Sequence, residues 1–139
     1  MTQTCADQFR VRVPIREEAD VVVARRHVRE LGLDVRLTEG AVEALATAVS
    51  EVARNIVVHA TGGEILLGVA EARGRSGVVV VARDDGPGIT DLEQAMQDGF
   101  STAKSLGLGL SSARRLVDEF DIVTGLDTGT TVTMRKWAS

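Results

Sequence analysis

Cysteine is nearly absent from the sequence: Cys5 is the only one in 139 residues, so no internal disulfide can form. This is typical of a protein from a reducing compartment. No apolar run approaches the roughly 18 residues that a membrane-spanning helix needs, and residues 1–8 lack the apolar core of a signal peptide. These absences predict a cytoplasmic protein without a membrane partner.

An excess of positive charge is also missing. The chain carries 16 Lys and Arg against 20 Asp and Glu, for a net charge of −4. A general nucleic-acid-binding protein would show a basic surplus, so we expect no nucleic-acid partner. The length fits one domain, and the apolar content of 44% is ordinary for a globular chain. We expect a flexible N-terminus over 1–8 and a single domain over 9–139.

The common nucleotide-binding signatures do not occur. There is no G-x-x-x-x-G-K-[ST] of a P-loop, no V-A-I-K strand and no H-R-D loop of a eukaryotic-type protein kinase. The segment 107–112 approaches the dinucleotide signature G-x-G-x-x-G, but Ser112 replaces the third glycine and no strand precedes it. We therefore exclude these three classes of nucleotide site.

Apolar periodicity predicts the helices and strands that are present. Alternation over 9–13 predicts a strand that ends at Pro14. Helical spacing predicts a helix over 17–31 with Gly32 as its C-cap, and a second over 38–58 with Thr38 as its N-cap. The remaining elements are strands over 64–71 and 78–83, a helix over 110–120, and strands over 122–124 and 130–137.

The order of these elements indicates the fold class. Strands and helices do not alternate, so a doubly wound parallel sheet is not expected. Val78 to Val81 are apolar on both faces, which is typical of a central strand. We predict an α+β fold, a two-layer sandwich in which a mixed, mostly antiparallel sheet carries its helices on one face.

The stretch from Asp84 to Leu110 is the least regular part of the chain. It holds five glycines and a proline in 27 residues, without an apolar run long enough for a strand. Such a long loop is uncommon in a compact domain unless it binds something or is disordered, and glycine lets the backbone approach a ligand closely. We interpret it as a nucleotide cradle in which Asp84 accepts from the amine of adenine, although Asp, Gly and Pro also favour plain turns.

The predicted second helix carries a polar pair. Glu51 and Asn55 are four residues apart and share one face, which we place opposite the apolar stripe and beside Ala44 and Ala48. An amide oxygen suits Mg²⁺, and a carboxylate can deprotonate a hydroxyl. The alternative interpretation is a solvated helix face.

These features together resemble the GHKL ATPase superfamily over residues 9–137. Four motifs occur in order: Glu51 and Asn55 in E-x-x-x-N, Asp84 to Gly88 in D-x-G-x-G, Gly107 to Leu110 in G-x-G-L, and Gly129-Thr130 before the last strand. Segments 50–56, 84–89 and 98–102 are most similar to the small anti-sigma and stress-switch serine/threonine kinases, the RsbT branch. The resemblance implies the Bergerat fold, with ATP and Mg²⁺ as cofactors.

The resemblance also implies a role for each matching residue. Asn55 would hold Mg²⁺, Glu51 would act as general base, Asp84 and Thr130 would contact adenine, and 89–106 would form an ATP lid. Lys104 would meet the γ-phosphate, and Ser105 stands where many relatives have another glycine. The implied ATP-binding set is Asn55, Asp84, Gly86, Gly88, Ile89, Ser101, Thr102, Lys104, Gly107, Leu108, Gly109, Leu110 and Thr130.

The implied function is an ATP-dependent serine/threonine kinase of a partner-switching module, acting on a STAS-domain antagonist protein. A second hypothesis is an anti-sigma factor or an activator of a PP2C-type phosphatase that works by binding, with ATP as a structural ligand. A third hypothesis is a detached histidine-kinase catalytic domain. Autophosphorylation on histidine is not expected, because the sequence has only His27 and His59. His27 is followed by Val28-Arg29, where a phospho-acceptor box has an acidic residue and a proline.

Overall fold

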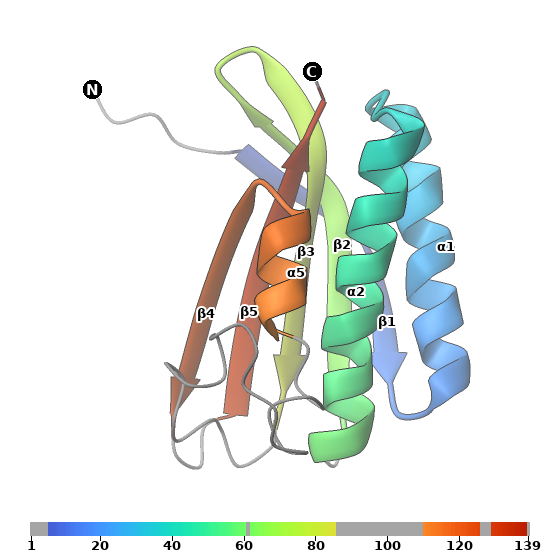
Figure 1. Cartoon of the computed structure of the whole chain (residues 1–139), viewed down its shortest axis with the longest axis vertical. Helices are drawn as coiled ribbons and strands as arrows, with labels where there is room; N and C mark the ends of the chain where they lie inside the picture. Colours follow the sequence, from blue (N-terminus) through green and yellow to red (C-terminus); the bar gives the residue numbers. More distant parts are fainter. Residues whose placement is uncertain (1–5, 61, 86–109, 126–128, 139) are drawn as a thin grey trace.

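A computed structural model describes residues 6–60, 62–85, 110–125 and 129–138. Within these ranges five strands form one sheet, and three helices lie on one of its faces (Figure 1). The elements in chain order are β1 (Ala6–Ile15), α1 (Glu18–Asp34), α2 (Glu39–His59), β2 (Gly63–Ala72), β3 (Arg75–Asp84), α5 (Leu110–Leu116), β4 (Glu119–Gly125) and β5 (Gly129–Trp137).

The sheet order is β1-β2-β3-β5-β4, and each neighbouring pair of described strands is antiparallel. This confirms the predicted two-layer α+β fold. β3 lies in the middle, and its residues Val78 to Val81 are at most 7% exposed, as predicted for a central strand. None of the described helices is long and apolar enough to cross a membrane.

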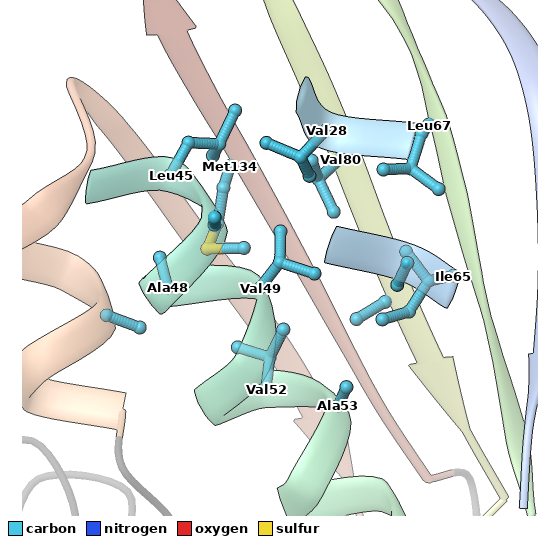
Figure 2. Close-up of a cluster of buried hydrophobic side chains, with 14 of the residues drawn as sticks. Val28, Leu45, Ala48, Val49, Val52, Ala53, Ile65, Leu67, Val80 and Met134 are labelled. Atoms are coloured by element: carbon cyan, nitrogen blue, oxygen red, sulfur yellow. The ribbon is translucent and has the colours of Figure 1, made fainter. Parts of the chain in front are cut away.

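The main core lies between the sheet and α2. The apolar stripe of α2 faces side chains of β2, β3 and β5 (Figure 2). Full burial of one such side chain contributes about 1.5–3 kcal/mol, so this layer holds the helix on the sheet. The stripe residues Leu45, Val49, Val52 and Ile56 are all at most 2% exposed.

The end of α1 differs from the prediction. Gly32 is not a C-cap but lies inside the helix, where an added Cβ would sit 2.7 Å from Cγ2 of Val42 on α2. The helix ends instead at Asp34 with Val35 as its C-cap, and Arg36 takes φ 62° in the position that glycine usually occupies. Leu37 N–H donates to the carbonyl of Gly32 at 2.9 Å, closing this C-terminal turn. Gly32 therefore serves the close approach of two helices.

Several boundaries of the strands also shift. β1 begins at Ala6, so residues 6–8, predicted within the flexible N-terminus, pair with β2. β2 and β3 are each longer than predicted, because the turn between them consists of Arg73 and Gly74 alone, both with positive φ. Such a two-residue turn matches the twist of the strands that it joins.

The third helix is shorter than predicted. α5 ends at Leu116, and Phe120 lies in β4, opposite Met134 of β5. Phe120 and Ile122 both pack against the main core, as expected for residues two apart on a strand. The predicted helix over 110–120 was too long because the spacing of Leu116, Val117 and Phe120 fits a helix as well as the observed helix end and strand.

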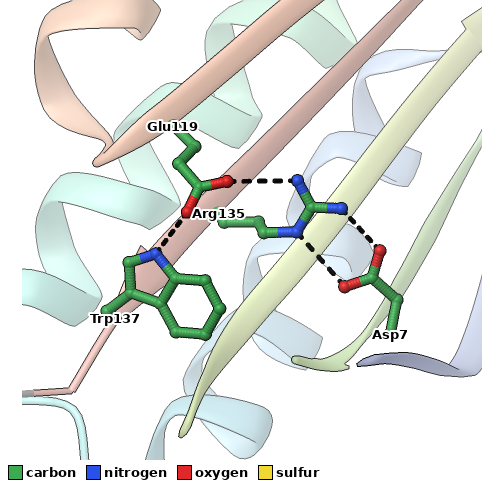
Figure 3. Close-up of polar contacts among 4 residues, drawn as sticks. All are labelled: Asp7, Glu119, Arg135 and Trp137. Atoms are coloured by element: carbon green, nitrogen blue, oxygen red, sulfur yellow. Dashed lines mark hydrogen bonds and ion pairs between the residues drawn. The ribbon is translucent and has the colours of Figure 1, made fainter. Parts of the chain in front are cut away.

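The sheet face away from the helices carries a polar network (Figure 3). Arg135 forms ion pairs with Asp7 at 2.6 Å and with Glu119 at 3.3 Å, and Glu119 accepts from Nε1 of Trp137 at 2.6 Å. Arg75 lies 5.0 Å from the centre of the Trp137 ring. The network joins residues of β1, β4 and β5 and covers a small second apolar cluster formed by Ala70, Val79 and Trp137.

Candidate functional site

Several candidate residues lie in one row at one end of the sheet. Gly63 of β2 is opposite Asp84 of β3, Asp84 is opposite Thr130 of β5, and Thr130 is opposite Thr124 of β4. Residues two positions away along these strands belong to the main core (Ile65, Ala82 and Val132) or pack against it (Ile122). Because side chains alternate along a strand, the row faces the helices.

Hydrogen bonds hold this row together. The backbone N–H of Thr130 donates to Oδ1 of Asp84 at 3.3 Å, and the hydroxyls of Thr130 and Thr124 are 2.9 Å apart. The Thr124 hydroxyl also donates to the carbonyl of Gly129 at 3.4 Å. Thr130 is only 5% exposed. The site thus presents a carboxylate and a hydroxyl at fixed positions on adjacent strands, which suits recognition of a polar base edge.

Two glycines allow the close approach of backbone at this end. Gly129 has φ 78°, and a Cβ there would lie 2.0 Å from the carbonyl oxygen of Asp84. A Cβ on Gly63 would lie 2.9 Å from Cγ2 of Ile56 on α2. The turn of α2 that carries Asn55 and Ile56 therefore lies directly against the row.

Asn55 is buried, so the alternative interpretation of a solvated helix face is wrong for this residue. It is 7% exposed, and its Oδ1 accepts no hydrogen bond within the described ranges. Ala48, on the same side of the helix, is fully buried. The side of α2 that carries Ala48 and Asn55 is thus packed rather than solvated, and α5 contacts α2.

An unpartnered buried acceptor is costly, about 1–3 kcal/mol, and such a group calls for an explanation such as an ion. A neutral amide oxygen is a ligand that Mg²⁺ accepts. Asn55 therefore fits the metal role that the sequence predicts for it. Glu51, one turn earlier on the same helix, is half-buried.

The other candidate residues divide into two groups. Leu110 is 1% exposed and packs in the main core, so a contact with phosphate at this position would come from its backbone. The lid segment 89–106 and nine candidates lie outside the described residues: Gly86, Gly88, Ile89, Ser101, Thr102, Lys104, Gly107, Leu108 and Gly109.

The structure adds features that sequence reasoning missed. Thr124 enters the row only through strand register, and no motif points to it. An open pocket of about 270 Å³ also lies beside the row, where Glu64 forms ion pairs with Arg12 and with Arg83, the latter at 3.7 Å. The residues lining it are Arg12, Gly62, Gly63, Glu64, Arg83, Asp84 and Asp85.

Comparison with known proteins matches residues 14–136 to the histidine kinase-like ATPase domain. The serine/threonine-protein kinase RsbT of Bacillus subtilis (strain 168) is 39% identical over 125 residues, which are 90% of this chain and 94% of that protein. The anti-sigma F factor of Bacillus cytotoxicus is 30% identical over 100 residues, or 68% of each chain. The anti-sigma F factor of Bacillus cereus (strain G9842) is 29% identical over the same share.

Proposed function

The chain belongs to the histidine kinase-like ATPase family, a family of ATP-binding domains, and from that membership we propose that it is a serine/threonine protein kinase using Mg²⁺ and ATP. The likeness to RsbT over nearly the full length of both chains supports the kinase. We place the reaction in the cytoplasm.

The observation that carries the proposal is the buried Oδ1 of Asn55, which has no partner among the described residues and lies one turn after Glu51. A fold that only needed stability would place an apolar residue here, since the orphaned oxygen costs free energy. Mg²⁺, when bound, would neutralise charge on the phosphates. Asn55 would hold that ion, and the packing of α2 on the sheet would keep the amide in place.

Asp84 and Thr130 would bind the adenine end of the nucleotide. The Asp84 carboxylate accepts hydrogen bonds, and adenine carries an amino group where guanine carries a carbonyl oxygen. The bond from Thr130 N–H to Asp84 Oδ1 holds the carboxylate in a defined orientation. Binding of the base against this row would orient the phosphates toward α2.

Glu51 would act as the general base. It would take the proton from a serine or threonine hydroxyl of the substrate protein as that oxygen gains the phosphoryl group and ADP is released. In this chemistry positioning and charge neutralisation supply most of the acceleration, and a general base contributes about 10²–10⁴-fold.

The substrate we propose is a STAS-domain antagonist protein of a partner-switching module. A second candidate role is binding a partner protein without phosphate transfer. The two anti-sigma F relatives support capture of a sigma factor. Activation of a PP2C-type phosphatase is the other binding role that we consider. In either binding role ATP would be a structural ligand.

The test incubates the protein with Mg·ATP and a STAS-domain protein from the same genome, and maps phosphoserine or phosphothreonine by mass spectrometry. Glu51→Gln is expected to bind ATP normally and to transfer phosphate about 10²–10⁴-fold more slowly. Asn55→Ala is expected to lose Mg²⁺-dependent ATP binding. Glu43→Gln is the matched control, because Glu43 is an exposed acid of α2 paired with Arg29 at 3.2 Å.

Transfer by Glu51→Gln at the wild-type rate would show that Glu51 is not the base. Normal ATP binding and transfer by both site variants would refute the site. ATP-dependent retention of a sigma factor by the wild type and by Glu51→Gln, with no phosphate transferred by either, would favour the binding role.

A further inference from the structure

Thr124 lies beside the proposed adenine site, although no sequence motif includes it. It lies on β4, opposite Thr130, and its hydroxyl is 2.9 Å from the Thr130 hydroxyl. It is the last member of the row Asp84, Thr130 and Thr124, each from a different strand. Through Thr130 it sits one side chain away from the proposed position of the base.

The direction of the hydrogen bonds follows from counting protons. A threonine hydroxyl has one proton to donate and two lone pairs to accept with. Thr124 donates its proton to the carbonyl of Gly129 at 3.4 Å. Either hydroxyl can donate in the 2.9 Å bond between the two threonines. When the Thr124 proton is on the Gly129 carbonyl, that bond uses the proton of Thr130, which leaves the Thr130 oxygen with acceptor capacity only.

With this polarity the row presents two neighbouring acceptors, the Asp84 carboxylate and the Thr130 oxygen. Two acceptors match an amino group, which has two N–H donors. They oppose a carbonyl oxygen, which has none. A Thr130 hydroxyl free to rotate could instead donate its proton to a carbonyl oxygen. The site would then bind a purine with either an amino group or a carbonyl oxygen at position 6.

We propose that Thr124 is a positioning residue that fixes the polarity of the Thr130 hydroxyl and thereby makes the site select a 6-amino purine nucleotide over a 6-oxo one. This inference rests on the proposed ATP-binding function. The residue acts only through Thr130 and Gly129, and it has no role in phosphate transfer itself.

The test measures dissociation constants by calorimetric titration for ATP, GTP and purine riboside triphosphate, which has no group at position 6. Thr124→Val keeps the shape of the side chain without its hydroxyl and is expected to lower the ATP-to-GTP affinity ratio about fivefold, the effect of one hydrogen bond. Binding of purine riboside triphosphate stays unchanged. Thr124→Ser restores the ratio, and Thr124→Ala behaves as Thr124→Val.

The control is Thr131→Val, next to Thr130 on β5 but on the opposite face of the sheet, and it is expected to leave all three affinities unchanged. A wild-type ratio in Thr124→Val, no rescue by Thr124→Ser, or equal weakening of all three nucleotides would overturn the inference. Equal ATP and GTP binding by the wild type would also overturn it. Wild-type protein that binds no nucleotide would refute the proposed function instead.

Discussion

Replacing Asn55 by leucine is expected to stabilise the nucleotide-free protein while removing its response to nucleotide. The Asn55 oxygen is buried without a partner in the described part of the chain, at 7% residue exposure. Removing an unsatisfied acceptor recovers about 1–3 kcal/mol, and leucine adds about 0.5 kcal/mol of helix propensity. The free energy of unfolding should therefore rise by about 1.5–3.5 kcal/mol.

Urea unfolding of wild type and Asn55→Leu, with and without Mg·ATP, measures both effects. Without nucleotide, the midpoint of Asn55→Leu should be higher at an unchanged m value. With Mg·ATP at about 100 times its dissociation constant, the wild type should gain about 2.7 kcal/mol. Asn55→Leu should gain nothing. With Mg·ATP the difference between the two free energies of unfolding should therefore become smaller or change sign.

Ser50→Ala is the matched control for this experiment. Ser50 is also buried on α2, at 5% exposure, but its hydroxyl donates to the carbonyl of Ala46 at 2.9 Å. Removing this satisfied bond should change stability by less than about 1 kcal/mol and leave the gain from Mg·ATP intact. The reasoning is refuted if Asn55→Leu is less stable than the wild type without nucleotide, or if it keeps the full gain with Mg·ATP.

Three further predictions concern backbone and packing. Gly129→Ala should lower stability by more than about 1–2 kcal/mol, because alanine disfavours φ 78° and its Cβ would overlap the Asp84 carbonyl oxygen; an unchanged urea midpoint would contradict this. Gly32→Ala should stabilise in a Val42→Ala background but not in the wild type, since the Cβ would meet Val42, and a double-mutant cycle should give a coupling above about 0.5 kcal/mol. Arg73→Asn should raise the melting temperature by one or two degrees, about 0.5 kcal/mol, because asparagine tolerates the φ of 54° in this turn; a lower melting temperature would count against the turn.

Most of the fold could be predicted because its signals are local. The period of the apolar residues in α2 and its cap at Thr38, which accepts from the Ala41 N–H at 3.1 Å, follow from a few neighbouring residues. The continuous apolar run of β3 indicated its central position. The errors at Gly32 and Phe120 arose where the local pattern fits two structures, and contacts with Val42 and Met134 decided between them.

The sequence by itself determined the fold class, the family resemblance and the candidate pair Glu51 and Asn55, since motif spacing and helical period are properties of the chain alone. Only the tertiary structure showed that α5 contacts α2, that Asn55 is buried, and that Thr124 joins Asp84 and Thr130 in one row. The reason is that burial and strand register depend on which distant segments meet. Alanines on a helix, or a threonine in an edge strand, carry no local signal of the partner that will cover or contact them.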